Sequence, residues 1–181
     1  TNGWPYYKEP QKFAEQLMEN WRDTGPQGRA LTAVLQKAWP YLESPDQTAH
    51  MLQEFFLNGT NNLLNNVFAI LSGSWEYISD ADAFVKKCID LMKQRVAIDK
   101  EQGQFVVGWT DFCVALQGVW EHLDKPEKLV KQLLPLITSA DYFYLPISFV
   151  GSLAFLKKPK DLANKLKTVS YTHLRAHETR F

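Results

Sequence analysis

Cysteine is scarce in this chain, and neither sign of charge is in excess. The 181 residues hold two Cys, and 20 Lys+Arg stand against 20 Asp+Glu. Two cysteines without a Cys-x-x-Cys spacing exclude a disulfide scaffold and provide no structural zinc pattern. Because dedicated nucleic-acid-binding domains are usually strongly basic, the neutral balance predicts no nucleic-acid partner.

Long apolar runs and catalytic motifs are also missing. No apolar run reaches the ~18 residues of a simple spanning helix, and no signal-peptide pattern opens the chain. These absences predict a cytoplasmic protein, at most peripheral to a membrane or granule surface. The sequence has no glycine-rich phosphate loop, nucleophile elbow or helical His-Glu-x-x-His. We therefore predict no catalytic residue, no metal site and no cofactor, and we interpret Cys88 and Cys113 as buried structural residues.

The remaining composition is that of an ordinary globular domain. With 45% hydrophobic and 22% charged residues, the chain is long enough to bury a core. Apolar residues recur at helical spacing almost throughout, which predicts an all-α helical bundle of about six or seven helices. No internal repeat is evident. We expect one helical domain over residues 1–168.

Capping residues and breakers place the helix boundaries. A first helix is expected to start near Pro10, and a second to run to Leu42 with a disturbed last turn. Ser44, Ser79 and Asp124 are the predicted N-caps of later helices, since each precedes an apolar-periodic run.

A long seam of apolar residues marks the middle of the chain. Its spacings alternate between four and three, as in a heptad repeat. The pattern predicts one long helix near 80–123, kinked at Gly103. A two-helix hairpin turning at Gly103 is the alternative. The seam comprises Phe84, Cys88, Leu91, Arg95, Ile98, Gln102, Phe105, Trp109, Phe112, Leu116, Val119 and Leu123.

The C-terminal tail has a different origin from the rest. Residues 169–179 read Val-Ser-Tyr-Thr-His-Leu-Arg-Ala-His-Glu-Thr. This run resembles the in-frame translation of a transposase-type sequencing adapter. The resemblance implies an artefactual tail, disordered or unpacked, and a natural C-terminus that is unknown. His173 and His177 have the i, i+4 spacing of metal ligands, but the resemblance explains them without a metal.

Aromatic residues and lysines suggest a surface for interaction. The chain has six Trp, and the stretch 133–156 is nearly free of charge before a run of lysines. Aromatic residues dominate interfaces, and lysine-flanked amphipathic helices bind anionic lipid. Residues 133–156 are either core or an interfacial helix. The candidate interaction face comprises Phe105, Trp109, Phe112, Trp120, Lys157, Lys158 and Lys160.

The texture of residues 80–123, with apolar seams, Gln and aromatics, is similar to that of phasins, helical proteins that coat polyhydroxyalkanoate granules. The resemblance implies a non-enzymatic protein with an apolar aromatic face. The face would bind a partner helix, a second copy in a homo-oligomer, or an anionic lipid or granule surface. The alternative is the N-terminal or accessory region of a longer enzyme whose catalytic residues lie beyond residue 168.

Overall fold

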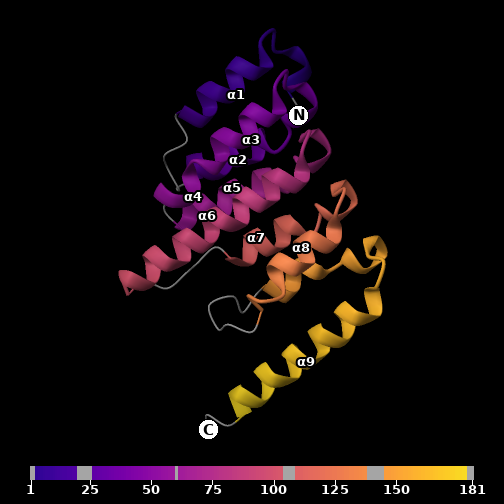
Figure 1. The fold of residues 1–181 in the computed structure, drawn as a ribbon. Coiled ribbons are helices and arrows are strands. Elements are labelled where there is room, and N and C mark those ends of the chain that lie inside the picture. The colour runs from indigo at the N-terminus through magenta and orange to yellow at the C-terminus, as the bar shows by residue number, and fades with distance from the viewer. Residues whose placement is uncertain (1–2, 20–25, 60, 104–108, 138–144, 179–181) are drawn as a thin grey trace.

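The computed structural model describes residues 3–19, 26–59, 61–103, 109–137 and 145–178. Regular structure in these ranges is helical and includes no strand, which confirms the predicted all-α class. The helices are stacked in chain order, from α1 at one end of the molecule to α9 at the other (Figure 1).

A short 3-10 turn followed by a helix occurs five times in the described part of the chain. Four turns begin with tryptophan, and they are η1 (Trp4–Tyr6), η2 (Trp39–Tyr41), η3 (Trp75–Tyr77) and η4 (Trp120–His122). In the fifth, η7 (Ser152–Phe155), Leu153 stands in the place of the tryptophan. The helices that follow are called A helices here: α1 (Pro10–Glu19), α3 (Pro45–Gln53) with its continuation α4 (Phe55–Asn58), α6 (Ala81–Glu101), α8 (Pro126–Leu133) and α9 (Pro159–Glu178).

Within the described residues, a second helical element follows each of the first four A helices. These B elements are α2 (Pro26–Leu35), α5 (Asn61–Leu71), α7 (Trp109–Leu116) and the 3-10 helix η6 (Leu145–Phe149). They form a continuous layer, because α2 packs on α5, α5 on α7 and α7 on η6. The chain is therefore an array of repeated helical units, and the prediction that it has no internal repeat is wrong.

The starts of the A helices have a common sequence basis. Each begins six residues after Trp4, Trp39, Trp75, Trp120 or Leu153, and four of the five begin with proline. Proline suits the first helical position because its fixed φ is already helical and its missing N–H has no partner to lose there. The same interval thus produces the same turn and helix start in every repeat.

A tryptophan ladder joins each repeat to the following B element. The indole Nε1–H of each tryptophan donates to a backbone carbonyl near the end of that element. The bonds are Trp4 to Val34 at 2.8 Å, Trp39 to Ile70 at 3.1 Å, Trp75 to Ala115 at 2.8 Å and Trp120 to Ser148 at 2.7 Å. These acceptors all lie five residues before the next Trp39, Trp75, Trp120 or Leu153, so the contact repeats in register.

A second ladder runs between successive A helices. The side chain of the second residue of one A helix accepts the backbone N–H of a residue just before the next A helix. The bonds are Gln11 to Ser44 at 3.2 Å, Asp46 to Ser79 at 2.9 Å, Asp82 to Asp124 at 2.8 Å and Glu127 to Lys157 at 3.0 Å. Both layers of the array are therefore tied by bonds that recur from repeat to repeat.

Two of the three predicted caps were misplaced, at residues whose backbone N–H bonds the preceding repeat. Asp80, one residue beyond Ser79, is the N-cap of α6 and accepts the N–H of Ala83 at 2.8 Å. Ser44 precedes α3 but makes no side-chain capping bond. The N-cap of α8 is Lys125 rather than Asp124. The second helix also ends earlier than Leu42, since α2 stops at Leu35 and η2 follows.

The interval 80–123 is divided between α6 and α7, so the predicted single long helix is wrong. α6 ends at Glu101, and Gly103 has a φ of +65°, a left-handed conformation that stops a helix. The seam also leaves the core before this point, because the side chain of Ile98 is 37% exposed. The heptad phase across the break is therefore no evidence of helical continuity.

We predict that Gly103→Ala destabilises the chain by about 1–2 kcal/mol, because a side chain is disfavoured in left-handed backbone. Apart from its chain neighbours, no described residue lies within 4 Å of a Cβ built there, so the left-handed backbone sets the effect. Urea unfolding measures it. Gly103→Asn is the matched control and should cost less, since Asn tolerates this conformation. Stabilisation by Gly103→Ala would contradict the turn.

Residues 169–178 continue α9, so the backbone of most of the tail is helical. The side chains of these residues, including His173 and His177, lie outside the described part of the structure.

Candidate interaction surface

Two residues of the predicted aromatic face are core residues. Phe112 and Trp120 are 2% and 1% exposed. The Phe112 ring lies 5.2 Å from that of Phe68, and Trp120 stacks on Phe149 with centroids 5.8 Å apart. In the folded chain they cannot present an apolar face, because Phe112 packs against the preceding B element α5 and Trp120 against the following one, η6. Phe105 and the side chain of Trp109 lie outside the described residues.

The three lysines of the predicted face are on the surface, where they form a lysine cluster of Lys157, Lys158 and Lys160. The backbone N–H of Lys157 donates to Glu127, and this bond lowers the pKa of the Glu127 carboxyl below its usual range. The lysine cluster thus stands at the start of α9, where the ladder between A helices fixes its backbone.

Exposed apolar side chains lie next to the lysine cluster in the chain. Val150 is 60% exposed, Leu153 41% and Phe155 43%. We call these three residues the C-terminal patch. They belong to the stretch 133–156, which is core in part, since Leu133, Ile137, Leu145 and Phe149 are buried, and exposed in part. The apolar character of the stretch was visible in the sequence, but which side chains are exposed depends on the repeat.

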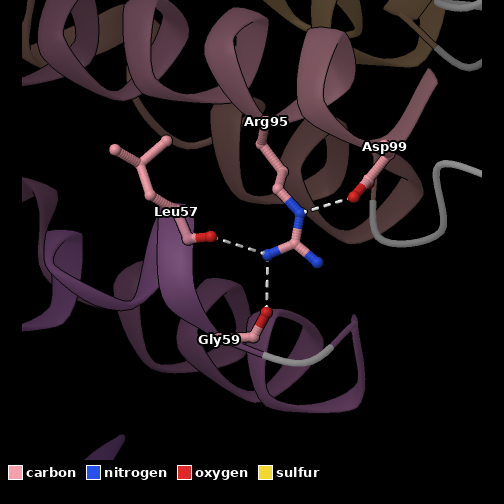
Figure 2. Close-up of polar contacts among 4 residues, drawn as sticks. All are labelled: Leu57, Gly59, Arg95 and Asp99. Atoms are coloured by element: carbon pink, nitrogen blue, oxygen red, sulfur yellow. Dashed lines mark hydrogen bonds and ion pairs between the residues drawn. The ribbon is translucent and has the colours of Figure 1, made fainter. Parts of the chain in front are cut away.

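A buried ion pair lies elsewhere, on α6 where this helix packs against the end of α4 (Figure 2). Arg95 Nε lies 2.8 Å from Asp99 Oδ1, one helical turn away on α6. Arg95 Nη1 donates to the carbonyls of Leu57 at 3.2 Å and Gly59 at 2.6 Å. The guanidinium therefore caps the C-terminal end of α4, where a cation is favourable. This contact explains why an arginine interrupts the apolar seam.

The Arg95–Asp99 pair is a structural clamp rather than a catalytic site. Asp99 is 1% exposed, and among the described residues its Oδ2 has no hydrogen-bond partner. The grooves at Ser79–Gln132, at Gln36–Tyr77 and at Tyr7–Gln16 are lined by other residues. The pair holds α4 against α6 and thereby fixes the boundary between two repeats.

A polar groove of about 500 Å³ lies between the N-terminal ends of α6 and α8. Two of the three aspartates that line it have structural roles: Asp80 caps α6, and Asp82 accepts the backbone N–H of the third, Asp124. His122 faces Glu121 at 3.5 Å at one side of the groove. This arrangement has no nucleophile paired with a base, and the described residues hold no cluster of three or more potential metal ligands.

Both cysteines are buried, as the sequence predicts. Burial raises the pKa of Cys88 to about 12, although Gln53 Nε2 donates to its sulfur at 3.0 Å. Burial also raises the pKa of Cys113 to about 12. Reactive cysteines have lowered pKa values and are accessible, so neither thiol is a candidate nucleophile.

We predict that neither thiol reacts with a disulfide reagent at pH 8 unless the chain unfolds. The pKa values are higher in the folded than in the unfolded chain. The two protonated thiols therefore stabilise the folded chain fully below the unfolded pKa of about 9, and this stabilisation is lost as the pH rises toward 12. Thiol titration with and without urea measures the effect, and the Cys88→Ala and Cys113→Ala variants assign it. Rapid labelling of the native chain would contradict the burial.

Comparison of the chain with protein-family models, curated proteins and solved structures found no match. Within the described residues, no helix has the length and apolarity needed to cross a membrane. The geometry of the chain itself defines a helical-repeat array, with the exposed C-terminal patch and lysine cluster at its last repeat.

Proposed function

We propose that the chain is a non-enzymatic helical-repeat scaffold that binds another protein. The observation that carries this proposal is the tryptophan ladder, which repeats the same contact at Trp4, Trp39, Trp75 and Trp120. Arrays of this kind are extended along one direction, and their stacked units present large surfaces for partners.

The chemistry of the side chains supports a binding role. The buried carboxylates and thiols hold the repeats together, as Asp99 does through Arg95 and Cys88 through Gln53. Among the exposed large apolar residues that the structure describes, Val150, Leu153 and Phe155 lie close together in the chain beside the lysine cluster, whereas the others are spread over other elements: Tyr6, Tyr7, Val34, Ile98 and Val114. Exposed apolar groups bordered by charge are typical of protein interaction sites.

Selection of helical peptides tests the proposal. A display library of random amphipathic helices is panned against the full chain, and the affinity of enriched peptides is measured by fluorescence anisotropy. We expect enriched peptides to bind the folded chain and to lose binding when urea unfolds it. Failure to enrich any peptide over a panning against an unrelated helical protein would contradict the scaffold function.

A lipid or polymer surface is the competing partner, and a vesicle assay separates it from a protein. The full chain is sedimented with phosphatidylserine vesicles at low and high salt. We expect no salt-sensitive association of the folded chain with the vesicles. Association that the lysine cluster variant Lys157→Glu/Lys158→Glu/Lys160→Glu abolishes would favour the anionic surface instead.

A further inference from the structure

The last repeat differs from the others in what covers its turn. Trp39, Trp75 and Trp120 are 2%, 4% and 1% exposed, and each lies against the B element that follows it. Leu153 stands in the same register and is 41% exposed. α9 packs on η7 as the next A helix, but no described element continues the B layer beyond η6. The exposed position is thus one that a B helix covers in every preceding repeat.

A second register points to the same uncovered position. Gln36 and Gln117 each stand three residues before a tryptophan, and their amides donate to Ala69 at 2.9 Å and Ile147 at 3.1 Å on the following B element. Val150 stands three residues before Leu153 and is 60% exposed. At this end both contact positions are apolar, so burial rather than a side-chain hydrogen bond would hold the neighbour.

From these registers we propose that the C-terminal patch is a docking site for one amphipathic α-helix of a partner protein, lying where the next B helix would lie. The inference rests on the proposed scaffold function and names the partner. Continuity with the B layer determines both the kind of occupant and its position. The end of the docked helix comes beside Leu153, as the end of α7 comes beside Trp75.

A second copy of the chain does not fit this site in the same register. The α2 helix of the second copy would have to place its Val34 carbonyl against Leu153 of the first copy. That carbonyl already accepts the indole N–H of the chain's own Trp4, which is 3% exposed. The turn at Trp4 therefore occupies the face of α2 that Leu153 would need, and head-to-tail stacking of two copies would require that turn to be displaced.

The lysine cluster adds a charge preference to the proposal. Lys157, Lys158 and Lys160 follow Leu153 by four to seven residues and are exposed. The C-terminal end of the docked helix would lie near them. Acidic residues at that end would complement the lysines, and the attraction would weaken with salt.

Supplying a B helix in cis tests the docking site. The segment that follows α6 in this chain, residues 102–119, is copied and appended after residue 181, because α9 and α6 are nearly equal in length, at 20 and 21 residues. A fusion carrying a scrambled copy is the control. We expect the native copy to raise the Tm by about 3 °C or more relative to the control. We also expect it to slow amide exchange at residues 150–156.

Variants of the patch assign the gain to its position. Leu153→Asp should abolish the difference in Tm between the two fusions. Val150→Asp should have the same effect. Because Val150 is more exposed than Leu153, this variant should leave the folding of the unfused chain intact. Equal Tm and exchange in both fusions would overturn the proposal, and so would a gain insensitive to both variants.

Peptides in trans test the charge preference. The probes are residues 109–119 with three Glu or three Lys added at the C-terminus. At low salt we expect the Glu peptide to bind at least about tenfold more tightly, and Lys157→Glu/Lys158→Glu/Lys160→Glu to remove this difference. Equal binding would refute the acidic partner. Display peptides that bind elsewhere and ignore Leu153→Asp would refute the docking site but leave the scaffold function standing. Vesicle binding lost in Leu153→Asp, without any effect of the appended helix, would replace the helix with a lipid surface.

Discussion

Trp120→Ala is expected to destabilise the folded chain by about 3–5 kcal/mol, the usual cost of removing a large aromatic side chain from a core. Trp120 is 1% exposed, stacks on Phe149 and donates to the carbonyl of Ser148. The variant removes the ring and also leaves a buried carbonyl without its donor. Urea unfolding followed by circular dichroism measures the loss. The sequence-based expectation, in which this residue binds a partner and leaves folding alone, predicts almost no change.

Two control variants separate the contributions at this site. Trp120→Phe keeps an aromatic ring but removes the donor, so it should cost about 1–3 kcal/mol through the unpaired carbonyl. Tyr6→Ala removes an aromatic side chain that is 87% exposed, and it should cost no more than about 0.5 kcal/mol. If Trp120→Ala were as mild as Tyr6→Ala, the tryptophan ladder would not hold the repeats together.

Arg95→Met is expected to cost about 3–5 kcal/mol, because removing one partner of a buried ion pair leaves the other charge uncompensated. Asp99 would remain at 1% exposure without its cation, and the carbonyls of Leu57 and Gly59 would lose a donor. Urea unfolding of the two single variants and the double variant Arg95→Met/Asp99→Leu forms a double-mutant cycle. The double variant should recover much of the loss, since apolar side chains can replace a buried pair.

Lys93→Met provides the matched control on the same helix. Lys93 and Asp90 are 4.0 Å apart, and their side chains are 39% and 52% exposed. An exposed pair of this kind contributes about 0–1 kcal/mol. A loss at Arg95→Met no larger than at Lys93→Met would show that the contact between α4 and α6 does not depend on the guanidinium.

The all-α class could be predicted because helical periodicity depends on local sequence. Pro10, Pro45 and Pro126 mark helix starts correctly, since proline acts through its own φ. Ser44 is the N-cap residue of α3 as predicted, although it makes no side-chain capping bond, whereas the predicted caps at Ser79 and Asp124 lie one residue too early. The backbone N–H groups of these three residues bond the side chains of Gln11, Asp46 and Asp82 from the preceding repeat, and no local rule specifies such a partner.

The repeat was missed because its spacing is irregular and its last member is altered. Trp4, Trp39, Trp75 and Trp120 recur at intervals of 35, 36 and 45 residues, and Leu153 replaces the fifth tryptophan. A tryptophan six residues before a helix start was the available signal. This signal indicates a repeat only when the B elements that precede the tryptophans are also aligned by their distance from the tryptophan.

The candidate surface could be predicted only in part for the same reason. The lysines were recognisable as exposed because a run of like charges stays solvated. Phe112 and Trp120 were indistinguishable in sequence from interface aromatics, since both roles require a large apolar side chain on a helical stripe. Leu153 and Val150 become informative only once their register in the array shows which contacts they lack.

The tryptophan ladder also has a consequence for how the array can diverge. Each indole donates to a main-chain oxygen, and the residues that supply it are Val34, Ile70, Ala115 and Ser148. A valine, an isoleucine, an alanine and a serine serve equally because every residue type carries the same carbonyl. The donor therefore has to be a tryptophan, whereas the residue that supplies the acceptor carbonyl can be of any type if it stands at the right position. Drift of the receiving side chains can erase the likeness between repeats in sequence while their geometry of assembly persists.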